Sequence, residues 1–396
     1  MSARILVLTA AFGEGHNAAA RAVAAGFERN AGPGVARIHD AFALASPRFN
    51  NAARWFYLTL INHAPRLWSQ VYDWIDRSSL VQKRLWIFRR EIRVLAQLIE
   101  TERPDAICCT YPLYGFFLER LACSGLKVPP TYNVVTDSIS IHSLWWRAAC
   151  TGWFLPNEDS AEVLRQAGIP SEAIHVCGFP VPRFFADNAA VLSPPDPASN
   201  NPRVLHIINS GTRHAEETAR RLLTETTWNV TCAVGRDAAL QARLTRFAAA
   251  RTSPATILGW TDQIPRLLMT HHVVVSKAGG ATTQESIASL CPMVVSQIVP
   301  GQEEGNYELL RRNHAGALAE TPAAVLAELT RAFADRGRIW REWRAALRPL
   351  ARPDAAGDIA RHVLAMLPTI RTEPEQLARI VGEPLIVGSA APLRVV

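Results

Sequence analysis

The sequence predicts an α/β protein made of two Rossmann-like domains that face a cleft, and three observations lead to this prediction. The chain has 396 residues, more than one domain usually holds. Apolar strands alternate with longer helical stretches in both halves, which is typical of parallel sheets covered by helices. A segment rich in proline, serine and asparagine, residues 187–202, separates the halves and has the composition of a linker.

The first half begins with an apolar run that we interpret as a strand. It is too short for the core of a signal peptide, and no cleavage site follows it. A helix is expected after it, at residues 17–27. The expected strands of this half are residues 5–10, 35–39, 106–110, 131–136 and 152–155. Together these elements predict an N-terminal domain over residues 1–186.

The second half repeats the alternation after the linker. Its expected strands are residues 204–208, 228–234, 256–258, 273–276 and 293–297. They predict a C-terminal domain over residues 203–370, and the tail, residues 371–396, has no assigned role. Because ligands of such sheets bind at the carboxyl ends of the strands, we expect the functional site between the two domains.

Composition narrows the compartment and the partners of the chain. The seven cysteines form an odd set without metal-ligand spacing, which favours a reducing, cytoplasmic environment. No apolar run in the sequence reaches the about 20 residues of a membrane-spanning helix. The formal net charge of +7 permits a nucleic acid or an anionic membrane as partner, and the distribution of that charge has to distinguish them.

The first glycine-rich loop joins the expected first strand to its helix. Gly13 and Gly15 allow a tight turn, and the free N–H groups at the helix start favour an anion. The spacing Gly13-x-Gly15-x-x-Ala18 also resembles a dinucleotide-binding fingerprint, with Asp40 where a ribose-binding acid would lie. A generic strand–turn–helix corner or another phosphate ligand stays open. His16 is either a helix cap or a neutral general base, because the helix dipole lowers the pKa of a histidine there.

A second loop of small residues follows the expected strand at 273–276. Its backbone N–H groups and the hydroxyls of Thr282 and Thr283 suit a pyrophosphate, and Glu285 is placed to accept both hydroxyls of a ribose. One strand later, a Gly/Pro-rich loop brings together glutamine, glutamate and asparagine, which bind sugar hydroxyls. The predicted donor-site residues are Lys277, Gly279, Gly280, Ala281, Thr282, Thr283, Glu285, Gln302, Glu303 and Asn306.

These two loops resemble the donor site of GT-B glycosyltransferases, and the chain is similar to glycosyltransferase family 28 over residues 4–365. The chain resembles the members of this family that are monogalactosyldiacylglycerol synthases and processive diacylglycerol glucosyltransferases. Further matching segments are the Gly13-x-Gly15-His16 loop, residues 133–137 with His142 and Trp145, and residues 177–181. Glu14 departs from the pattern, since many members have glycine there. The resemblance implies GT-B architecture, with an N-terminal domain that faces acceptor and membrane and a C-terminal domain that binds the nucleotide sugar.

The resemblance also implies a reaction: transfer of a hexose, galactose or glucose, from a UDP-sugar to diacylglycerol, with inversion at the anomeric carbon. Such a step needs a base near the acceptor hydroxyl and groups that stabilise the leaving diphosphate. We assign His16 or Asp137 as the base, alone or as a pair in which the carboxylate orients the imidazole. Gly13, Gly15 and His142 are placed in the acceptor loops. The sequence has no Asp-x-Asp motif, so we expect no cofactor and no obligatory metal in the donor site.

Residues 48–93 combine aromatic and basic side chains. The segment has nine arginines and lysines against three acids, which accounts for most of the net charge of the chain. Rings and cations mixed at helical spacing are typical of a surface that lies on an anionic membrane, although packing against the N-terminal sheet is the alternative. No nucleic-acid motif accompanies the charge, so nucleic acid is not an expected partner. We therefore expect a peripheral protein on the inner face of the membrane, without an obligate protein partner.

Three alternative functions stay open at this point. The chain can be a related transferase with another lipid acceptor, such as a polyprenyl lipid or a sterol. It can be a UDP-sugar epimerase of the same architecture, which would turn over the sugar nucleotide without lipid. It can also be a non-enzymatic membrane-binding protein on a decayed scaffold, against which the intact His16, Asp137, Glu285 and Asn306 argue.

Overall fold

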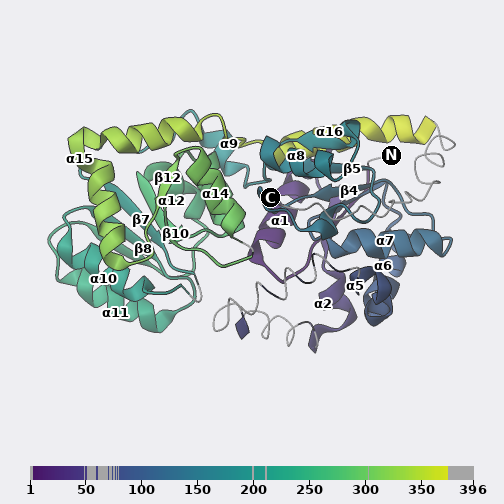
Figure 1. Cartoon of the computed structure of the whole chain (residues 1–396), viewed down its shortest axis with the longest axis horizontal. Coiled ribbons are helices and arrows are strands. Elements are labelled where there is room, and N and C mark those ends of the chain that lie inside the picture. The colour runs from purple at the N-terminus through teal and green to yellow at the C-terminus, as the bar shows by residue number, and fades with distance from the viewer. Residues whose placement is uncertain are drawn as a thin grey trace, which may run out of the picture.

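The computed structural model describes residues 3–48, 50, 59–60, 70, 74, 76, 78, 80–198, 200–209, 212–301 and 303–372. They form two six-stranded sheets, each the centre of one half of the molecule (Figure 1). All strand pairings in both sheets are parallel. The predicted α/β architecture of two Rossmann-like domains is confirmed.

The N-terminal sheet has the strand order β2-β1-β3-β4-β5-β6. Its strands are β1 (Ile5–Leu8), β2 (Ala36–His39), β3 (Ala106–Cys109), β4 (Thr131–Val134), β5 (Gly152–Leu155) and β6 (Ile174–Val176). Ile5 and Val7 of β1 pack into the hydrophobic cluster on one face, and Leu6 and Leu8 pack into the cluster on the other. Burial on both faces explains why this strand is a continuous apolar run.

Helices cover both faces of this sheet, and short 3-10 turns (η) join some of them. The elements are α1 (Glu14–Ala31), α2 (Ala41–Ala45), α5 (Leu80–Lys83), η1 (Leu85–Phe88), α6 (Arg89–Glu102), α7 (Leu113–Cys123), η2 (Ser143–Trp145), α8 (Glu158–Gln166) and η3 (Ser171–Ala173). The helix α1 begins three residues before the predicted start and so includes His16 in its first turn.

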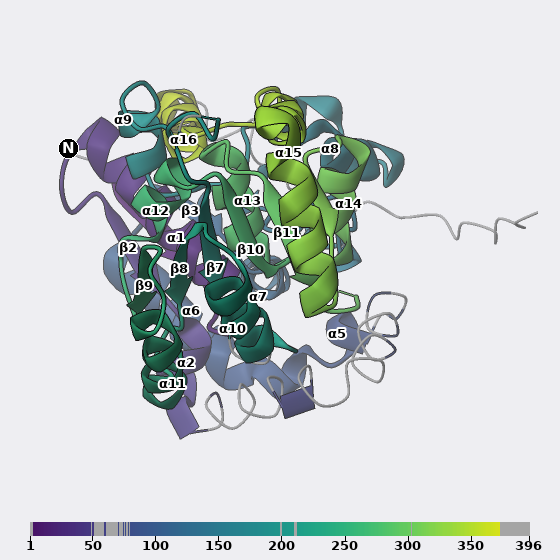
Figure 2. The ribbon, with the colours of Figure 1, turned by 90° about the vertical axis from the view of Figure 1, so that its left-hand side faces the viewer.

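The C-terminal sheet has the strand order β12-β11-β10-β7-β8-β9. Its strands are β7 (Arg203–Ile207), β8 (Asn229–Ala233), β9 (Ala255–Leu258), β10 (Val273–Lys277), β11 (Met293–Gln297) and β12 (Gly316–Leu318). The helices of this half are α9 (Phe184–Asn188), α10 (Ala215–Glu225), α11 (Ala238–Ala249), α12 (Ile264–Thr270), α13 (Gly280–Ala288), α14 (Glu304–Arg312) and α15 (Pro322–Leu347). Figure 2 shows α10 and α15 on the same side of this sheet.

Two short strands were not predicted from the sequence. β6 and β12 have three residues each, too few for a pattern of apolar alternation to stand out. The predicted linker is also partly wrong, because α9 overlaps its beginning and Phe185 is fully buried in a cluster with Leu268 and Met269 of α12.

The last helix, α16 (Ala355–Thr372), corrects the predicted C-terminal boundary at residue 370. It packs along α1, and its Ile359 and Val363 join the cluster that contains Phe27. Figure 1 accordingly shows α16 over the N-terminal half. A Cβ on Gly26 would stand 2.3 Å from the Ala356 carbonyl oxygen, so glycine is required where α1 and α16 touch. The N-terminal unit is therefore completed by α16.

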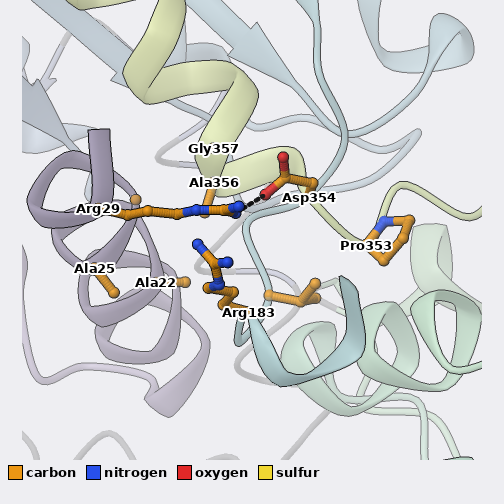
Figure 3. A pocket seen from close by; sticks show the side chains of 10 residues that line it. Ala22, Ala25, Arg29, Arg183, Pro353, Asp354, Ala356 and Gly357 are labelled. Atoms are coloured by element: carbon orange, nitrogen blue, oxygen red, sulfur yellow. Dashed lines mark ion pairs between the residues drawn. The ribbon is translucent and has the colours of Figure 1, made fainter. Parts of the chain in front are cut away.

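A shallow pocket marks the point at which the chain crosses back to the N-terminal half (Figure 3). Asp354 precedes α16 and forms ion pairs with Arg29 of α1 at 3.6 Å and with Arg361 of α16 at 2.9 Å. Arg183 lines the same pocket from the first crossing of the chain. Both crossings between the domains thus lie together beside α1.

Candidate functional site

Each sheet has one position at which the order of its strands reverses. In the N-terminal sheet the reversal lies between β1 and β3, and in the C-terminal sheet it lies between β7 and β10. The loops that leave these strands diverge to opposite faces and leave a crevice at the carboxyl ends. The predicted loop with His16 lies at the first reversal, and the predicted loop at 277–283 lies at the second.

The two loops face each other across the domain interface. A Cβ on Gly15 would stand 3.9 Å from the backbone nitrogen of Ala281, and a Cβ on Gly280 would stand 3.7 Å from the carbonyl oxygen of Thr136. The starts of α1 and α13 are therefore close neighbours, although they belong to different sheets. The structure brings together the predicted acceptor loop and the predicted donor loop.

His16 is held by the strand next to its own. Its Nδ1 lies 2.8 Å from the carbonyl oxygen of Thr110 and 2.9 Å from Oγ1 of Thr136. A carbonyl oxygen can only accept, so Nδ1 carries the proton and Nε2 keeps its lone pair. Thr110 also donates from its hydroxyl to the His16 carbonyl at 3.1 Å. Burial lowers the pKa of His16 to about 4, against the opposing effect of the Thr110 hydrogen bond, so the imidazole is neutral at pH 7.

Asp137 lies beyond the end of β4. Its Oδ2 accepts from Nε1 of Trp145 at 2.9 Å and from the backbone N–H of His142 at 3.4 Å. Burial raises the pKa of Asp137 to about 6, with a smaller contribution from Asp76, and the two hydrogen bonds act in the opposite direction. The predicted pairing of the carboxylate with His16 is not formed, because the Thr110 carbonyl holds the nitrogen that such a carboxylate would orient.

His142 connects the Asp137 loop to the basic aromatic segment. Its Nδ1 accepts from the backbone N–H of Leu144 at 3.2 Å and lies 3.3 Å from Oδ1 of Asp76. Ser143 adds two hydrogen bonds to Asp76, with its N–H at 2.6 Å and its hydroxyl at 2.8 Å. The predicted acceptor-loop residue His142 is thus buried and positions the loop.

The start of α13 offers free backbone donors to an anion. Gly279 caps the helix, and the N–H groups of the first turn, those of Gly280, Ala281 and Thr282, have no helical acceptor. Thr283 does not contribute as predicted, because its N–H donates to the Gly279 carbonyl and its hydroxyl contacts the sulfur of Met293 at 3.8 Å. The helical periodicity of α13 explains why Thr283 is buried.

Thr283 precedes Ile287 by four residues, so both side chains lie on the face of α13 that covers the sheet. Glu285 lies elsewhere on the helix, beside α1. Burial raises the pKa of Glu285 to about 7, with Arg21 of α1 acting in the opposite direction. Among the residues that the structure describes, no donor forms a hydrogen bond with this carboxylate, which leaves it available for the hydroxyls of a ligand.

The second donor loop is held closed by its own acid. Glu303 is buried, pairs through Oε1 with Nζ of Lys277, and accepts the Val299 N–H through Oε2 at 3.0 Å. Both carboxylate oxygens of Glu303 therefore have partners within the protein, and Glu303 stabilises the loop. Asn306 donates to the Ala278 carbonyl at 3.0 Å, and its buried Oδ1 has no partner among the described residues. Gln302 lies outside the residues that the structure describes.

The N-terminal glycine loop does not form a dinucleotide site of the kind its spacing suggests. Asp40, the proposed ribose acid, caps α2 by accepting the Ala43 N–H at 3.0 Å and also accepts the Ala11 N–H at 3.0 Å. Both carboxylate oxygens are thus used within the loop. Gly13 caps α1 with an extended backbone, φ −167°.

Sequence reasoning missed Thr110 and Thr136, which hold His16, and Arg21, whose charge acts on Glu285. Thr110 follows β3 directly and Thr136 lies two residues after β4, at the edge where ligands bind. Their position at strand ends was a usable signal, but hydroxyl side chains there are common. The neighbourhood of Arg21 and Glu285 depends on the contact between α1 and α13 and has no local signal.

The architecture is that of GT-B glycosyltransferases, as solved structures show. Calicheamicin glycosyltransferase CalG4 matches with a TM-score of 0.56 and 14% identity over 93% of this chain and all of that chain, 100%. Acinetobacter baumannii MurG matches with a TM-score of 0.58 and 13% identity over 92% and 100% of the two chains. The UDP complex of S. aureus MnaA matches with a TM-score of 0.59 and 14% identity over 94% of this chain and 98% of that chain.

Sequence relatives are more specific. Residues 16–181 match the family model of monogalactosyldiacylglycerol (MGDG) synthase. A processive diacylglycerol beta-glucosyltransferase of Bacillus cereus is 23% identical over 91% of this chain and 93% of its own length. The Bacillus cytotoxicus enzyme of that name is 22% identical over the same shares. The predicted resemblance, and with it the predicted class of enzyme, a glycosyltransferase, is confirmed.

The basic aromatic segment is described in part. In η1, Leu85 and Phe88 pack against the N-terminal core, whereas Trp86 and Ile87 are 70% and 50% exposed. Trp74 is 57% exposed. The remaining predicted membrane-facing residues between 48 and 79 lie largely outside the described part. Within the described part, no helix combines the length and the apolar character needed to cross a bilayer.

Proposed function

We propose that the chain transfers a hexose, galactose or glucose, from a UDP-sugar to the hydroxyl of diacylglycerol. The observation that carries the proposal is that the loop of the neutral His16 lies opposite the start of α13. Within the described residues, Nε2 of His16 forms no hydrogen bond and the first N–H groups of α13 have no helical acceptor. One side supplies a proton acceptor and the other supplies donors for a diphosphate. The acceptor class follows from the names of the sequence relatives, which act on diacylglycerol.

The donor would lie on the C-terminal sheet. The diphosphate is bound by the N–H groups of Gly280, Ala281 and Thr282 at the positive end of α13. The ribose hydroxyls donate to Glu285, which is ionised once they bind. The hexose lies toward Asn306, whose Oδ1 lacks a protein partner within the described residues. Lys277 and Glu303 keep the loop in shape.

The reaction is an in-line displacement. The acceptor oxygen attacks the anomeric carbon as its proton passes to His16 or Asp137, the bond from that carbon to UDP breaks, and the configuration inverts. The helix start of α13 stabilises the charge that develops on the leaving diphosphate. Because His16 is neutral at pH 7, its Nε2 lone pair is available for a proton, and burial brings the pKa of Asp137 to about 6, nearer to neutral pH.

We further propose peripheral attachment to the inner face of the membrane through residues 48–93. Trp86 and Ile87 project from η1 between Arg84 and Arg89, all exposed. Rings at headgroup depth and arginines beside anionic lipid headgroups stabilise such a contact. Asp76 of the same segment accepts a hydrogen bond from Ser143, so the segment contacts the loop that follows Asp137.

Incubation with labelled UDP-glucose or UDP-galactose and diacylglycerol liposomes, followed by separation of the lipids, tests the function. A labelled glycosyldiacylglycerol that depends on one of the donors supports it. An altered sugar nucleotide formed without lipid would instead identify an epimerase. Transfer to a polyprenyl lipid or a sterol in place of diacylglycerol would identify the related transferase. Binding to liposomes without any turnover would contradict all three.

A further inference from the structure

The loop that begins at Asp137 contains a strained turn. Ile139 has φ +58°, a left-handed conformation that β-branched residues rarely adopt. The Ser140 N–H donates to the Ser138 carbonyl at 2.6 Å, so Ile139 is the centre of a three-residue γ-turn with positive φ. This form is rare because it is strained. Ser160 of α8 supports the turn by accepting the Ile139 N–H at 3.1 Å.

The turn reaches into the other domain. Ile139 packs against the hydrophobic cluster of the C-terminal half that includes Leu309 and Leu310 of α14. At the start of α14, a Cβ on Gly305 would stand 1.9 Å from the Ser138 carbonyl oxygen and 2.8 Å from the Ser140 nitrogen. Atoms cannot approach so closely, so only glycine permits this contact between the backbones of the two domains.

We propose that Ile139 and Gly305 are positioning residues that hold Asp137 in its working place when the two domains are in contact. A strained backbone persists only where its surroundings compensate for the strain. Here part of the compensation comes from Ser160 of the same domain, and part comes from the opposite domain, through the apolar contact of Ile139 and the fit of the turn against Gly305. When the domains separate, the turn loses both and relaxes. Asp137, two residues earlier, then moves with it.

The first test uses the ligand-free protein and does not depend on the proposed function. Gly305→Ala and Ile139→Ala should raise deuterium uptake in peptides that cover residues 137–142, and Gly305→Ala should also increase the radius of gyration. Ile139→Val keeps a β-branched apolar side chain and should behave like the unchanged chain. A melting curve of each variant confirms that it is folded.

Leu290→Ala is the matched control. Leu290 also has a left-handed backbone, φ +55°, and packs against the same cluster, but it follows α13 within the C-terminal half. It should lower stability without changing exchange at residues 137–142. If Gly305→Ala and Ile139→Ala show the same exchange as the unchanged chain, the inference is wrong, whatever their activity.

The second test rests on the proposed function, because it needs sugar transfer. Displacing a reacting group by about 1 Å can slow a reaction about a hundredfold, so we expect kcat to fall at least about tenfold in Gly305→Ala and Ile139→Ala. UDP affinity should stay within about twofold, since the diphosphate and ribose bind to α13. A loss of UDP affinity equal to the loss of kcat would contradict a positioning role. Absence of transfer by the unchanged chain would contradict the proposed function and leave the exchange result standing.

Discussion

Replacing Glu285 by glutamine is expected to stabilise the ligand-free protein and to weaken its binding of UDP. Burial raises the pKa of this carboxyl from 4.5 to about 7. A carboxyl with a higher pKa in the folded state binds more protons when folded, so the free energy of unfolding falls as pH rises from about 4.5 to about 7. With 1.36 kcal/mol per pKa unit, ionised Glu285 costs about 3 kcal/mol at pH 8, of which about 2.5 kcal/mol appears between pH 5 and pH 8.

The buried carboxylate of Glu285, which destabilises the ligand-free protein, is expected to strengthen the binding of UDP. Ribose hydroxyls that donate to a carboxylate form charge-assisted hydrogen bonds, each worth about 1.5–3 kcal/mol. Glutamine is uncharged and presents one acceptor oxygen, so Glu285→Gln should weaken UDP binding about 10- to 100-fold at pH 8. The affinity of the unchanged chain should rise with pH through about 7, as Glu285 ionises. The affinity of the variant should not follow this rise.

Urea unfolding at pH 5 and pH 8, with calorimetric titration of UDP at both values, measures the two effects. Glu172→Gln, at an exposed position of η3, is the control and should change neither quantity. Unchanged UDP affinity in Glu285→Gln would remove Glu285 from the donor site. Equal stability of variant and unchanged chain at pH 8 would show that the ionised carboxylate is not destabilised by burial, and the physical reasoning would be wrong.

Three further predictions follow from the site. The rate of transfer should rise with pH through about 6 as Asp137 ionises, and Asp137→Asn should remove this rise from the pH–rate profile. His16→Asn should lower kcat about 100-fold or more at every pH measured above 5, because His16, with a pKa of about 4, is neutral throughout that range. Thr283→Val should leave UDP affinity within about twofold by calorimetry, since its buried hydroxyl donates to the sulfur of Met293; a larger loss would place Thr283 in the donor site. Trp86→Ser should reduce sedimentation with anionic vesicles severalfold, and Trp260→Ser, a 69% exposed tryptophan of the C-terminal half, should not; equal effects would contradict docking through η1.

Local patterns indicate the parts of the candidate site that lie within one strand–turn–helix unit. The loop of His16 and the start of α13 belong to this class, because the strand, the small residues and the helix are contiguous in the sequence. Thr110, the hydrogen-bond partner of His16, does not belong to this class. Thr110 lies 94 positions away and reaches His16 only because β3 pairs with β1 on the side opposite β2. The order of strands in a parallel sheet follows from the packing of the whole domain, which no local pattern contains.

The errors have equally specific causes. The loop pattern predicts Thr283 at the phosphate, but Ile287, four residues later, marks that face of α13 as buried, and helical periodicity places Thr283 on the same face. The helix α16 carries an apolar face, but both domains offer a sheet that such a face can cover. Its place on α1 depends on Gly26, whose missing side chain admits the Ala356 carbonyl. This glycine lies in the middle of α1, so no turn pattern in the sequence indicates its role.

The glycines at the domain interface differ in the space that each leaves for a Cβ atom. A Cβ at Gly15 or Gly280 would stand 3.9 Å or 3.7 Å from its nearest neighbour, which is ordinary van der Waals contact, so these two positions have room for a methyl group. A Cβ at Gly305 would overlap the Ser138 carbonyl, so this glycine sets how closely the domains approach. Alanine should therefore fit at the first two positions and disrupt the contact between the domains at the third. The glycine-rich loops look alike in the sequence, but the geometry distinguishes the glycines that have room for a side chain from the glycine that has none.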